Sequence, residues 1–429
     1  DNSTTGSPRR NQSFVGRATY NYKKKYLFEA NLGITGSEQF APDYRYGVFP
    51  SVAVGYTISR EKFWKKAMPW WSTFKIRGSW GLVGSETTSG FLYYTAYQKV
   101  NYANFGMHYR EGSAANEGAR WETADKKDIG VEMGFFKDNL SINVDFFDEY
   151  RYDMLMTPVT TPLIGVAFKQ TNAGALKKHG VDIDILWRKS YKSGFFYSIG
   201  GLLSLNENRI VKYADIPFDP EYKKVAGTPS LSQRSGSTLV DDKYFQNINE
   251  IHGYPAYTSS WVNMIPGVYK FLDYKPEGAI TDEDLHVIGG SSYPPCSYSL
   301  NFSVGYKGLT FRAVGVGTIG KYIQFKRAYI LPFLAGDLAV HQAQRDYWSP
   351  TNRDATAPAL TYNDQMYSWA GGTSAHPGYD LALEGYTWRN SDYFNISELY
   401  LGYKFDGKKL RQALGIDGLT VSLSCNNVF

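Results

Sequence analysis

The sequence predicts an all-β protein, a transmembrane antiparallel β-barrel, and three observations lead to this prediction. Apolar and polar residues alternate with period two over stretches of about ten residues, as in strands with one apolar and one polar face. Aromatic residues make up 16% of the 429 residues, and such residues gather where one face is wet and the other apolar. Short polar turns also alternate with loops longer than those of compact soluble domains.

The alternating stretches follow one another along the whole chain. They cover 14–22, 26–35, 74–83, 122–136, 139–152, 180–189, 194–206, 298–306, 309–318, 395–404 and 419–428. We expect about twelve strands of roughly ten residues each. A strand of about eleven residues, tilted by about 40°, covers roughly 28 Å, which is close to the apolar thickness of a bilayer. Strands of soluble proteins are typically about five or six residues long.

The connections predict two different rims. Turns at 23–25, 137–139, 190–193 and 307–308 are short, whereas loops at 85–121, 153–177, 207–297 and 320–391 are long. Outer-membrane barrels place short turns at the periplasmic rim and long loops at the extracellular rim. We therefore expect a strict alternation of short periplasmic turns and long extracellular loops.

The stretch from Asn139 to Pro158 predicts which face of the wall meets lipid. Its apolar set is Leu140, Ile142, Val144 and Phe146, alternating with polar residues at 141, 143 and 145. A sheet in lipid must close on itself to pair its backbone, so we expect the apolar set to face lipid and the polar set the lumen. Phe147, Tyr150 and Tyr152 are then expected to be interface anchors, with an external loop beginning at Asp153.

Several functional classes are not favoured by the residues. The net charge of +5 is small and dispersed, which gives no support for nucleic acid binding. The six histidines show no metal spacing, and neither H-E-x-x-H nor G-x-S-x-G occurs, so no enzymatic activity is expected. The segment 315–320 matches G-x-G-x-x-G, but no helix start follows it, and small residues in a packed barrel strand are the favoured interpretation.

One loop partly matches a calcium-binding loop. An EF-hand-type loop has oxygen ligands at positions 1, 3, 5 and 12 and Gly at position 6. Asp273, Glu277 and Asp284 fill positions 1, 5 and 12, and Gly278 fills position 6, but Lys275 occupies position 3. Because a cation at this position opposes a metal ion, the sequence favours a structured turn over bound calcium. No other cofactor is expected.

The long loops are rich in aromatic residues that suit a sugar or a peptide. The candidate ligand-binding residues are Tyr257, Trp261, Tyr347, Trp348, Tyr367 and Trp369. Aromatic faces with amides and carboxylates nearby are suited to such ligands. The alternative is that these rings pack the loops against one another, and the pattern does not distinguish a glycan from a peptide.

Several strings, taken in order, resemble the SusC/RagA-type TonB-dependent transporters of Bacteroidota outer membranes. They are FVGRATYNYKKKYLFEANLGITGSEQF, FPSVAVGY, FKIRGSWGLVGS, RWETADKKDIGVEMGFF, VDFFDEYRYDML, NAGALKKHGVDIDI, DYWSPTNRDATAP and YFNISELYLGYKF. Each string is weak by itself, whereas their order and spacing are together specific. The resemblance runs through most of the chain.

The resemblance implies that residues 1–429 form part of the barrel domain of a larger outer-membrane protein. The whole barrel would have about 22 strands, with the plug domain and the last strand outside this chain. The implied activity is TonB-dependent import of large nutrients, glycan oligosaccharides or peptides. The implied partners are a SusD-like surface lipoprotein and, through the plug, the TonB–ExbB–ExbD complex. The alternatives are a passive porin or surface-adhesin barrel and a soluble carbohydrate-binding β protein.

Overall fold

The protein consists of two compact units. The computed structural model describes residues 10–86, 90–102, 106–159, 163, 165–230, 239–257, 265–267, 269–280, 284, 291–324, 342, 345–360, 388–405, 407, 411–412, 415–416 and 418–428. Unit 1 comprises residues 1–216, 295–319 and 393–429, and unit 2 comprises 217–294 and 320–392. No helix in the described part of the chain is both long and apolar enough to cross a membrane.

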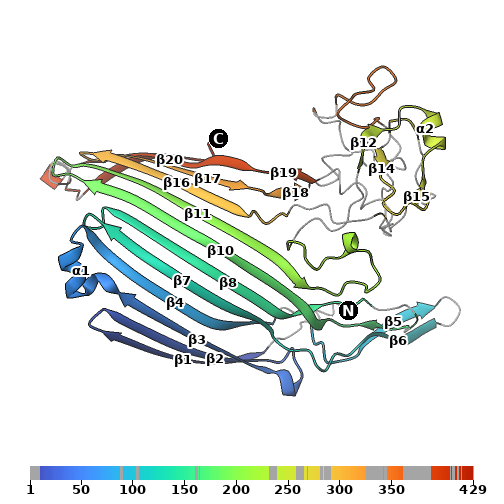
Figure 1. Cartoon of the computed structure of the whole chain (residues 1–429), viewed down its shortest axis with the longest axis horizontal. Coiled ribbons are helices and arrows are strands. Elements are labelled where there is room, and N and C mark those ends of the chain that lie inside the picture. Colours follow the sequence, from blue (N-terminus) through green and yellow to red (C-terminus); the bar gives the residue numbers. More distant parts are fainter. Residues whose placement is uncertain are drawn as a thin grey trace. The chain divides into compact units, whose positions relative to one another are not determined.

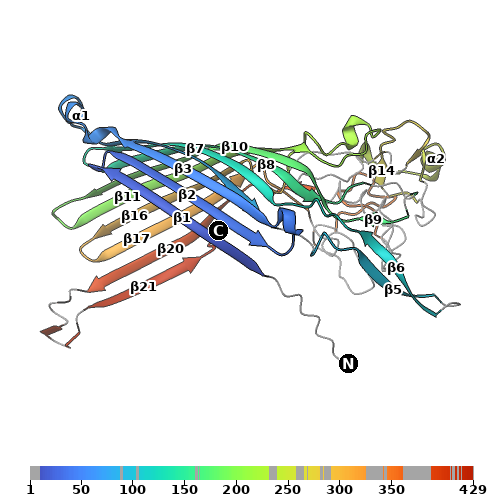
Figure 2. The ribbon, with the colours of Figure 1, turned by 90° about the horizontal axis from the view of Figure 1, so that it is seen from below.

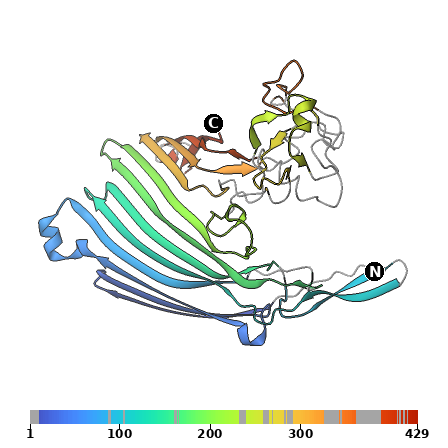
Figure 3. The same ribbon diagram turned by 45° about the vertical axis from the view of Figure 1, so that its right-hand side comes forward.

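Unit 1 contains a single antiparallel sheet of 12 strands, which confirms the expected all-β fold. In spatial order the strands are β1 (Asn11–Tyr22), β2 (Tyr26–Ser37), β3 (Tyr46–Thr57), β4 (Trp71–Ser85), β7 (Glu122–Phe135), β8 (Leu140–Met156), β10 (Thr171–Ser190), β11 (Phe195–Lys212), β16 (Cys296–Tyr306), β17 (Leu309–Ile319), β20 (Tyr393–Phe405) and β21 (Leu419–Asn426). The strands lie side by side in a long, curved sheet whose edges are β1 and β21 (Figures 1 and 3).

The register separates the sheet into an apolar and a polar face. One row of register partners is apolar across six adjacent strands: Ile76, Val131, Val144, Ile183, Leu203 and Tyr298. The neighbouring row is mostly polar: Lys75, Glu132, Asn143, Asp184, Leu202 and Ser299. Partners in a row share a face, and successive residues of a strand point to opposite faces. The alternation seen in one stretch of the sequence therefore extends over the sheet.

The short connections of unit 1 lie at one end of the sheet, which we call the short-turn rim (Figure 2). This rim is formed by residues 23–25, 58–70, 136–139, 191–194 and 307–308 and by the described residues between β20 and β21, and the other end is the long-loop rim. The expected strict alternation is wrong at three places. On the short-turn rim, the connection at 58–70 contains helix α1 (Lys62–Ala67), and the connection between β20 and β21 has the same length in the sequence. On the long-loop rim, the connection at 38–45 is short. A 3-10 turn at Pro42–Tyr44 makes that short connection.

Two expectations for β8 are also wrong. The strand does not give way to a loop at Asp153, because its pairing with β10 continues and Met156 is still opposite Thr171, although its pairing with β7 ends at Tyr152. Phe147 is not an anchor on the apolar face. The register of β8 with β7 is unbroken, so Phe147 shares the polar face with Asp145, and its ring lies 5.5 Å from the Lys178 ammonium. Tyr150 and Tyr152 do lie on the alternate, apolar-set side of the strand.

The long connections carry additional strands. On the long-loop rim of unit 1, β5 (Ala96–Tyr102) and β6 (Gly106–Ala114) form a hairpin that adds β9 (Ala167–Phe168) in parallel. Unit 2 contains three pairs of short strands: β12 (Leu239–Tyr244) with β14 (Tyr269–Phe271), β13 (Ala256–Tyr257) with β15 (Ala279–Ile280), and β18 (Tyr322–Gln324) with β19 (Trp388–Asn390). Helix α2 (Ile248–His252) is also in unit 2.

Candidate functional site

The polar face of the 12-stranded sheet carries a network of ion pairs centred on Arg77. The Arg77 guanidinium lies 3.1 Å from Asp128, 3.2 Å from Glu132 and 2.5 Å from Asp145. Lys75 contacts Glu132 at 2.9 Å. The strands β4, β7 and β8 place these groups in adjacent rows of the register. The sequence pattern predicted a polar face here but not which charges would meet.

A glycine makes room for this network. Gly130 is the register partner of both Arg77 and Asp145. A Cβ at residue 130 would lie 2.2 Å from Asp145 Oδ1 and 2.7 Å from Arg77 Cζ. Because both contacts are closer than atoms tolerate, the guanidinium reaches across β7 to β8 only over a residue without a side chain.

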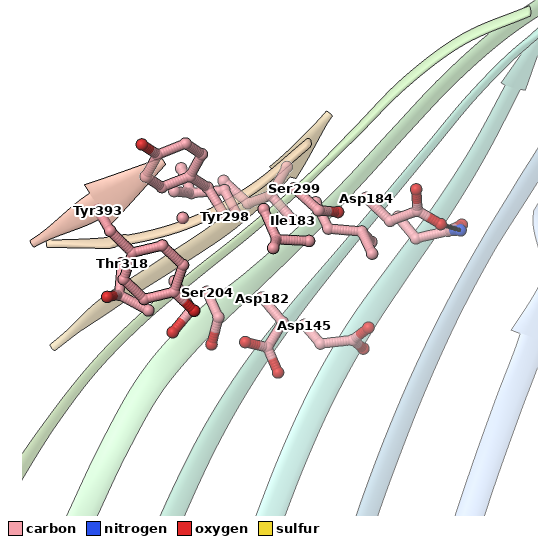
Figure 4. A pocket seen from close by; sticks show the side chains of 15 residues that line it. Asp145, Asp182, Ile183, Asp184, Ser204, Tyr298, Ser299, Thr318 and Tyr393 are labelled. Carbon is pink, nitrogen blue, oxygen red and sulfur yellow. Dashed lines mark hydrogen bonds between the residues drawn. The ribbon is translucent and has the colours of Figure 1, made fainter. Parts of the chain in front are cut away.

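Beside the network the polar face is hollowed, with a volume of about 610 Å³ (Figure 4). Its polar lining residues are Asn143, Asp145, Asp182, Asp184, Ser204, Ser297, Ser299, Thr318 and Tyr393. In Figure 4, Asp145, Asp182 and Ser204 lie next to one another, as their register on β8, β10 and β11 requires. Asn143 donates a hydrogen bond of 3.4 Å to Asp184. Carboxylates, hydroxyls and an amide at this surface suit hydrogen bonding to a polar solute.

The opposite face is apolar and packs aromatic rings over glycines. Tyr298 on β16 and Phe394 on β20 stack with ring centroids 6.2 Å apart. Gly315 and Gly317 of β17 lie beneath them, because a Cβ at these positions would lie 2.6 Å from Phe394 and 2.4 Å from Tyr298. The G-x-G-x-x-G segment therefore belongs to a packed strand, which confirms the interpretation made from the sequence.

An aromatic cluster that the sequence analysis did not identify lies at the long-loop rim of unit 1. Trp121 packs against Phe40 and Phe49, with ring centroids 5.3 Å and 5.6 Å away, and its indole N–H donates to the carbonyl of Arg45 at 3.0 Å. Leu92 completes the buried group. This cluster joins the 38–45 connection, the 90–95 segment and the start of β7. Trp121 directly before an alternating stretch was the one available signal.

The predicted ligand-binding aromatics have different surroundings. Trp348 is buried, 7% exposed, and its indole N–H donates to Gln246 at 3.2 Å. Tyr347 is 39% exposed. Tyr257 ends β13, and Trp261, Tyr367 and Trp369 lie outside the described residues. Trp348 is thus one of the buried residues of unit 2, as are Tyr244 and Phe245, and ligand binding by the predicted aromatics stays a prediction.

Near this core, Glu250 and Lys270 form a half-buried ion pair at 3.1 Å. Asn247 caps α2 by accepting a hydrogen bond from the Glu250 backbone N–H at 3.1 Å. The Glu250 carboxylate accepts from the backbone N–H of Gln246, and it is also bound by the Lys270 ammonium and the Asn247 amide. These contacts, the Gln246 amide first, hold the pKa of Glu250 below its usual value.

The candidate calcium ligands act as acceptors within their own loop. Asp273 accepts from the backbone N–H of Gly278 at 3.1 Å, and Asp284, fully buried, accepts from the backbone N–H of Lys275 at 3.0 Å. Glu277 lies 3.4 Å from the Lys275 ammonium. Among the described residues, no three His, Cys, Asp or Glu side chains lie close enough together to hold a metal ion. These contacts fit the structured turn that the sequence favoured over bound calcium.

The chain is similar to proteins named TonB-dependent receptors. TonB-dependent receptor P3 of Formosa agariphila is 26% identical over 357 residues, which are 81% of this chain and 35% of that protein. TonB-dependent receptor SusC of Bacteroides thetaiotaomicron is 24% identical over 406 residues, 92% of this chain and 38% of that protein. No family model matches the chain.

The fold is similar to that of a solved transporter. The structure of the RagAB peptide transporter superposes with a TM-score of 0.71 at 18% identity, covering 98% of this chain and 44% of that one. The resemblance to SusC/RagA-type transporters is thus confirmed, and with it the all-β fold expected for part of a barrel wall. The chain spans less than half the length of these relatives.

Proposed function

We propose that the chain forms part of the barrel wall of a TonB-dependent importer that takes large nutrients across the outer membrane. The observation that carries this proposal is the division of the 12-stranded sheet into one apolar and one polar face. Such a sheet suits lipid on one side and an aqueous lumen on the other. Relatives named TonB-dependent receptors support the energised mode of transport.

The proposed substrates are oligosaccharides or peptides. The lumen face offers paired charges of both signs around Arg77 and, beside them, hydroxyls and carboxylates in the hollow. This lining supplies hydrogen-bond donors and acceptors to a polar oligomer, and its charged groups within the hollow are Asp145, Asp182 and Asp184. The similar RagAB protein is a peptide transporter, which supports a peptide as one of the two substrate classes. A SusD-like lipoprotein at the long-loop rim and TonB at the plug complete the proposed assembly.

Transport by whole cells tests the proposal. The gene is expressed in a strain that lacks its own copy, and uptake of fluorescent oligopeptides and of oligosaccharides of similar mass is measured with and without TonB. We expect uptake of one class that disappears when TonB is deleted or the proton gradient is collapsed. Uptake that persists without TonB would instead support the passive porin, and surface binding without uptake would support the adhesin.

A pair of tryptophan variants tests whether the solute path follows the polar face. Ser204→Trp puts a large side chain into the hollow, whereas Leu205→Trp puts the same ring on the apolar face, at a residue that does not line the hollow. We expect the first variant to reduce uptake several-fold and the second to leave it near the parent level. Both proteins must be present in the outer membrane in equal amounts. Equal uptake by the two variants would contradict a solute path along this face.

A further inference from the structure

Five connections of the short-turn rim contain lysines that the structure describes. These lysines are Lys23, Lys24, Lys25, Lys62, Lys65, Lys66, Lys137, Lys192 and Lys307. Since these five connections lie at the same end of the sheet (Figures 1 and 2), they place a basic band along one rim. The mixed, paired charges of the polar face form a different pattern.

The lysines of this band are mostly exposed and unpaired. The connections contain two described carboxylates, Glu61 and Asp138. Glu61 pairs with Lys25 at 2.7 Å, and Asp138 accepts a hydrogen bond from the Thr73 hydroxyl at 3.0 Å. Among the described residues, the lysines other than Lys25 have no carboxylate within ion-pair distance. The rim therefore presents uncompensated positive charge.

Four of these lysines occupy backbone positions that suit other residues better. Lys23, Lys24, Lys137 and Lys307 have φ values of 53°, 55°, 60° and 46°. This left-handed region favours Gly and Asn, and two-residue hairpin turns with such angles prefer Asn-Gly. A lysine at these positions lowers stability relative to Asn. The turns thus carry positive charge at a conformational cost that the fold itself does not require.

Aromatic rings fix the depth of the ammonium groups. The ammonium of Lys23 lies 4.9 Å from the centroid of the Tyr22 ring, and that of Lys307 lies 5.0 Å from the Tyr306 ring. Tyr306 belongs to the apolar set of β16, and aromatic rings at strand ends lie at the level of lipid headgroups. Further rings at this rim belong to Trp64, Trp70, Trp71, Phe74 and Phe135, which contact one another. The lysines therefore lie at headgroup depth.

We propose that the short-turn rim binds the phosphate groups of anionic phospholipids in the leaflet that surrounds it. Lysine ammonium groups bind phosphate as point charges, and basic clusters next to a membrane attract anionic headgroups. The apolar face above the rim meets the acyl chains, and the cation–ring contacts hold the charge beside the lipid phosphates. This inference depends on the outer-membrane location and not on import, so either can fail without the other.

Tryptophan quenching by brominated lipids tests the proposal on the protein expressed from its whole gene. The protein is reconstituted in phosphatidylcholine bilayers that contain a minor fraction of brominated phosphatidylglycerol or, in parallel, brominated phosphatidylcholine. Trp70, 51% exposed at this rim, and the neighbouring Trp64 and Trp71 report on adjacent lipid. We expect roughly three- to five-fold stronger association of phosphatidylglycerol at low salt. The preference falls when NaCl is raised to about 0.5 M.

A triple variant separates charge from folding. In Lys23→Asn, Lys24→Asn, Lys307→Asn, the new residue fits the left-handed backbone better than lysine does, so folding is preserved. The matched control removes three exposed cations from the long-loop rim and its hairpin: Lys99→Asn, Arg110→Asn, Lys212→Asn. We expect the first variant to lose most of the lipid preference and the control to keep it. Heat-modified migration on gels confirms that both are folded.

Four outcomes would overturn the proposal. The first is equal quenching by the two brominated lipids in the parent protein. The second is an equal loss of preference in both triple variants. The third is displacement by about 10 mM inorganic phosphate beyond the effect of chloride at the same ionic strength, which would indicate a site for a free anion. The fourth is binding of polyglutamate to the rim without lipid discrimination, which would assign it to an acidic protein partner.

Discussion

The orientation of the wall is tested most directly by placing the same charge on either face of β8. Val144 lies four positions after Leu140, the first residue of β8 at the short-turn rim. Four residues at about 3.3 Å each, tilted by about 40°, place it roughly 10 Å into an apolar band about 25 Å tall. Val144 is thus near the midplane, between Val131 and Ile183 on the neighbouring strands.

An arginine at Val144 would therefore be costly. Arg on the lipid face near the midplane destabilises a barrel by about 2–4 kcal/mol, and the apolar partners Val131 and Ile183 offer it no counter-charge. Asn143 is the adjacent residue on the opposite face, beside Glu132 and Asp184. An arginine there meets two carboxylates across from it, so we expect Asn143→Arg to change stability by less than about 1 kcal/mol.

Assembly and unfolding provide the measurement. Both variants are expressed from the whole gene, the folded fraction is measured by heat-modified migration, and the free energy of unfolding is measured by urea titration after reconstitution. We expect Val144→Arg to reduce both quantities strongly and Asn143→Arg to leave them near the parent values. Similar effects of the two substitutions, or a larger effect at Asn143, would refute the assignment of lipid and lumen faces.

Three further predictions concern the network, unit 2 and pH. Gly130→Ala places a Cβ against Asp145 and Arg77, so it should lower the free energy of unfolding in urea by about 1–3 kcal/mol. Gly16→Ala, with open space around it, should lower it by less than about 1 kcal/mol. Equal losses in the two variants would contradict the close approach of Arg77 and Asp145 over Gly130. Trp348→Ala should lower the unfolding free energy of unit 2 by about 3–5 kcal/mol and speed its cleavage by protease. Tyr347→Ala, at an exposed ring, should leave the cleavage rate almost unchanged. Protease resistance of both variants would argue against Trp348 as a core residue. Because the pKa of Glu250 is lowered in the folded state from 4.5, its stabilisation is present above about pH 4.5 and is lost as the pH falls through the lowered value. Glu250→Gln should flatten this acid-side loss of protease resistance in unit 2, and identical pH profiles would contradict the role of the carboxylate.

Local alternation was sufficient to predict the wall of the barrel but not its details. Period-two patterns identified strands around Val144 and Ile183, and the register then extended both faces across their neighbours. The strand β3 was not identified from alternation, because Pro50 interrupts its pattern, and a proline argues against a strand when only the sequence is available. In the structure Pro50 is opposite Leu32 within a paired strand. Pairing with neighbours on both sides thus overrides the local signal.

The network and the aromatic cluster depend on contacts between distant parts of the sequence. Arg77 meets Asp145 only because β4, β7 and β8 are adjacent and in a particular register, and no local pattern contains that information. Trp121 reaches Phe40 for the same reason. For Phe147 the sequence did contain the needed information. Its aromatic character suggested an interface anchor, but the strict alternation along β8 places it on the polar face. Position within the period was a better guide than residue type.

The distribution of charge separates two roles within the same wall. On the polar face, Arg77 and Lys75 lie within 3.2 Å of carboxylates on neighbouring strands, so the lining is hydrophilic without a strong field of one sign. At the short-turn rim, lysines such as Lys24 and Lys137 face no described carboxylate and occupy strained turn positions. Asparagine would keep these turns soluble and would fit their backbone better than lysine does. The positive charge therefore has a role beyond solubility. At headgroup depth, the proposed partners of this charge are the anionic lipid headgroups beside the rim.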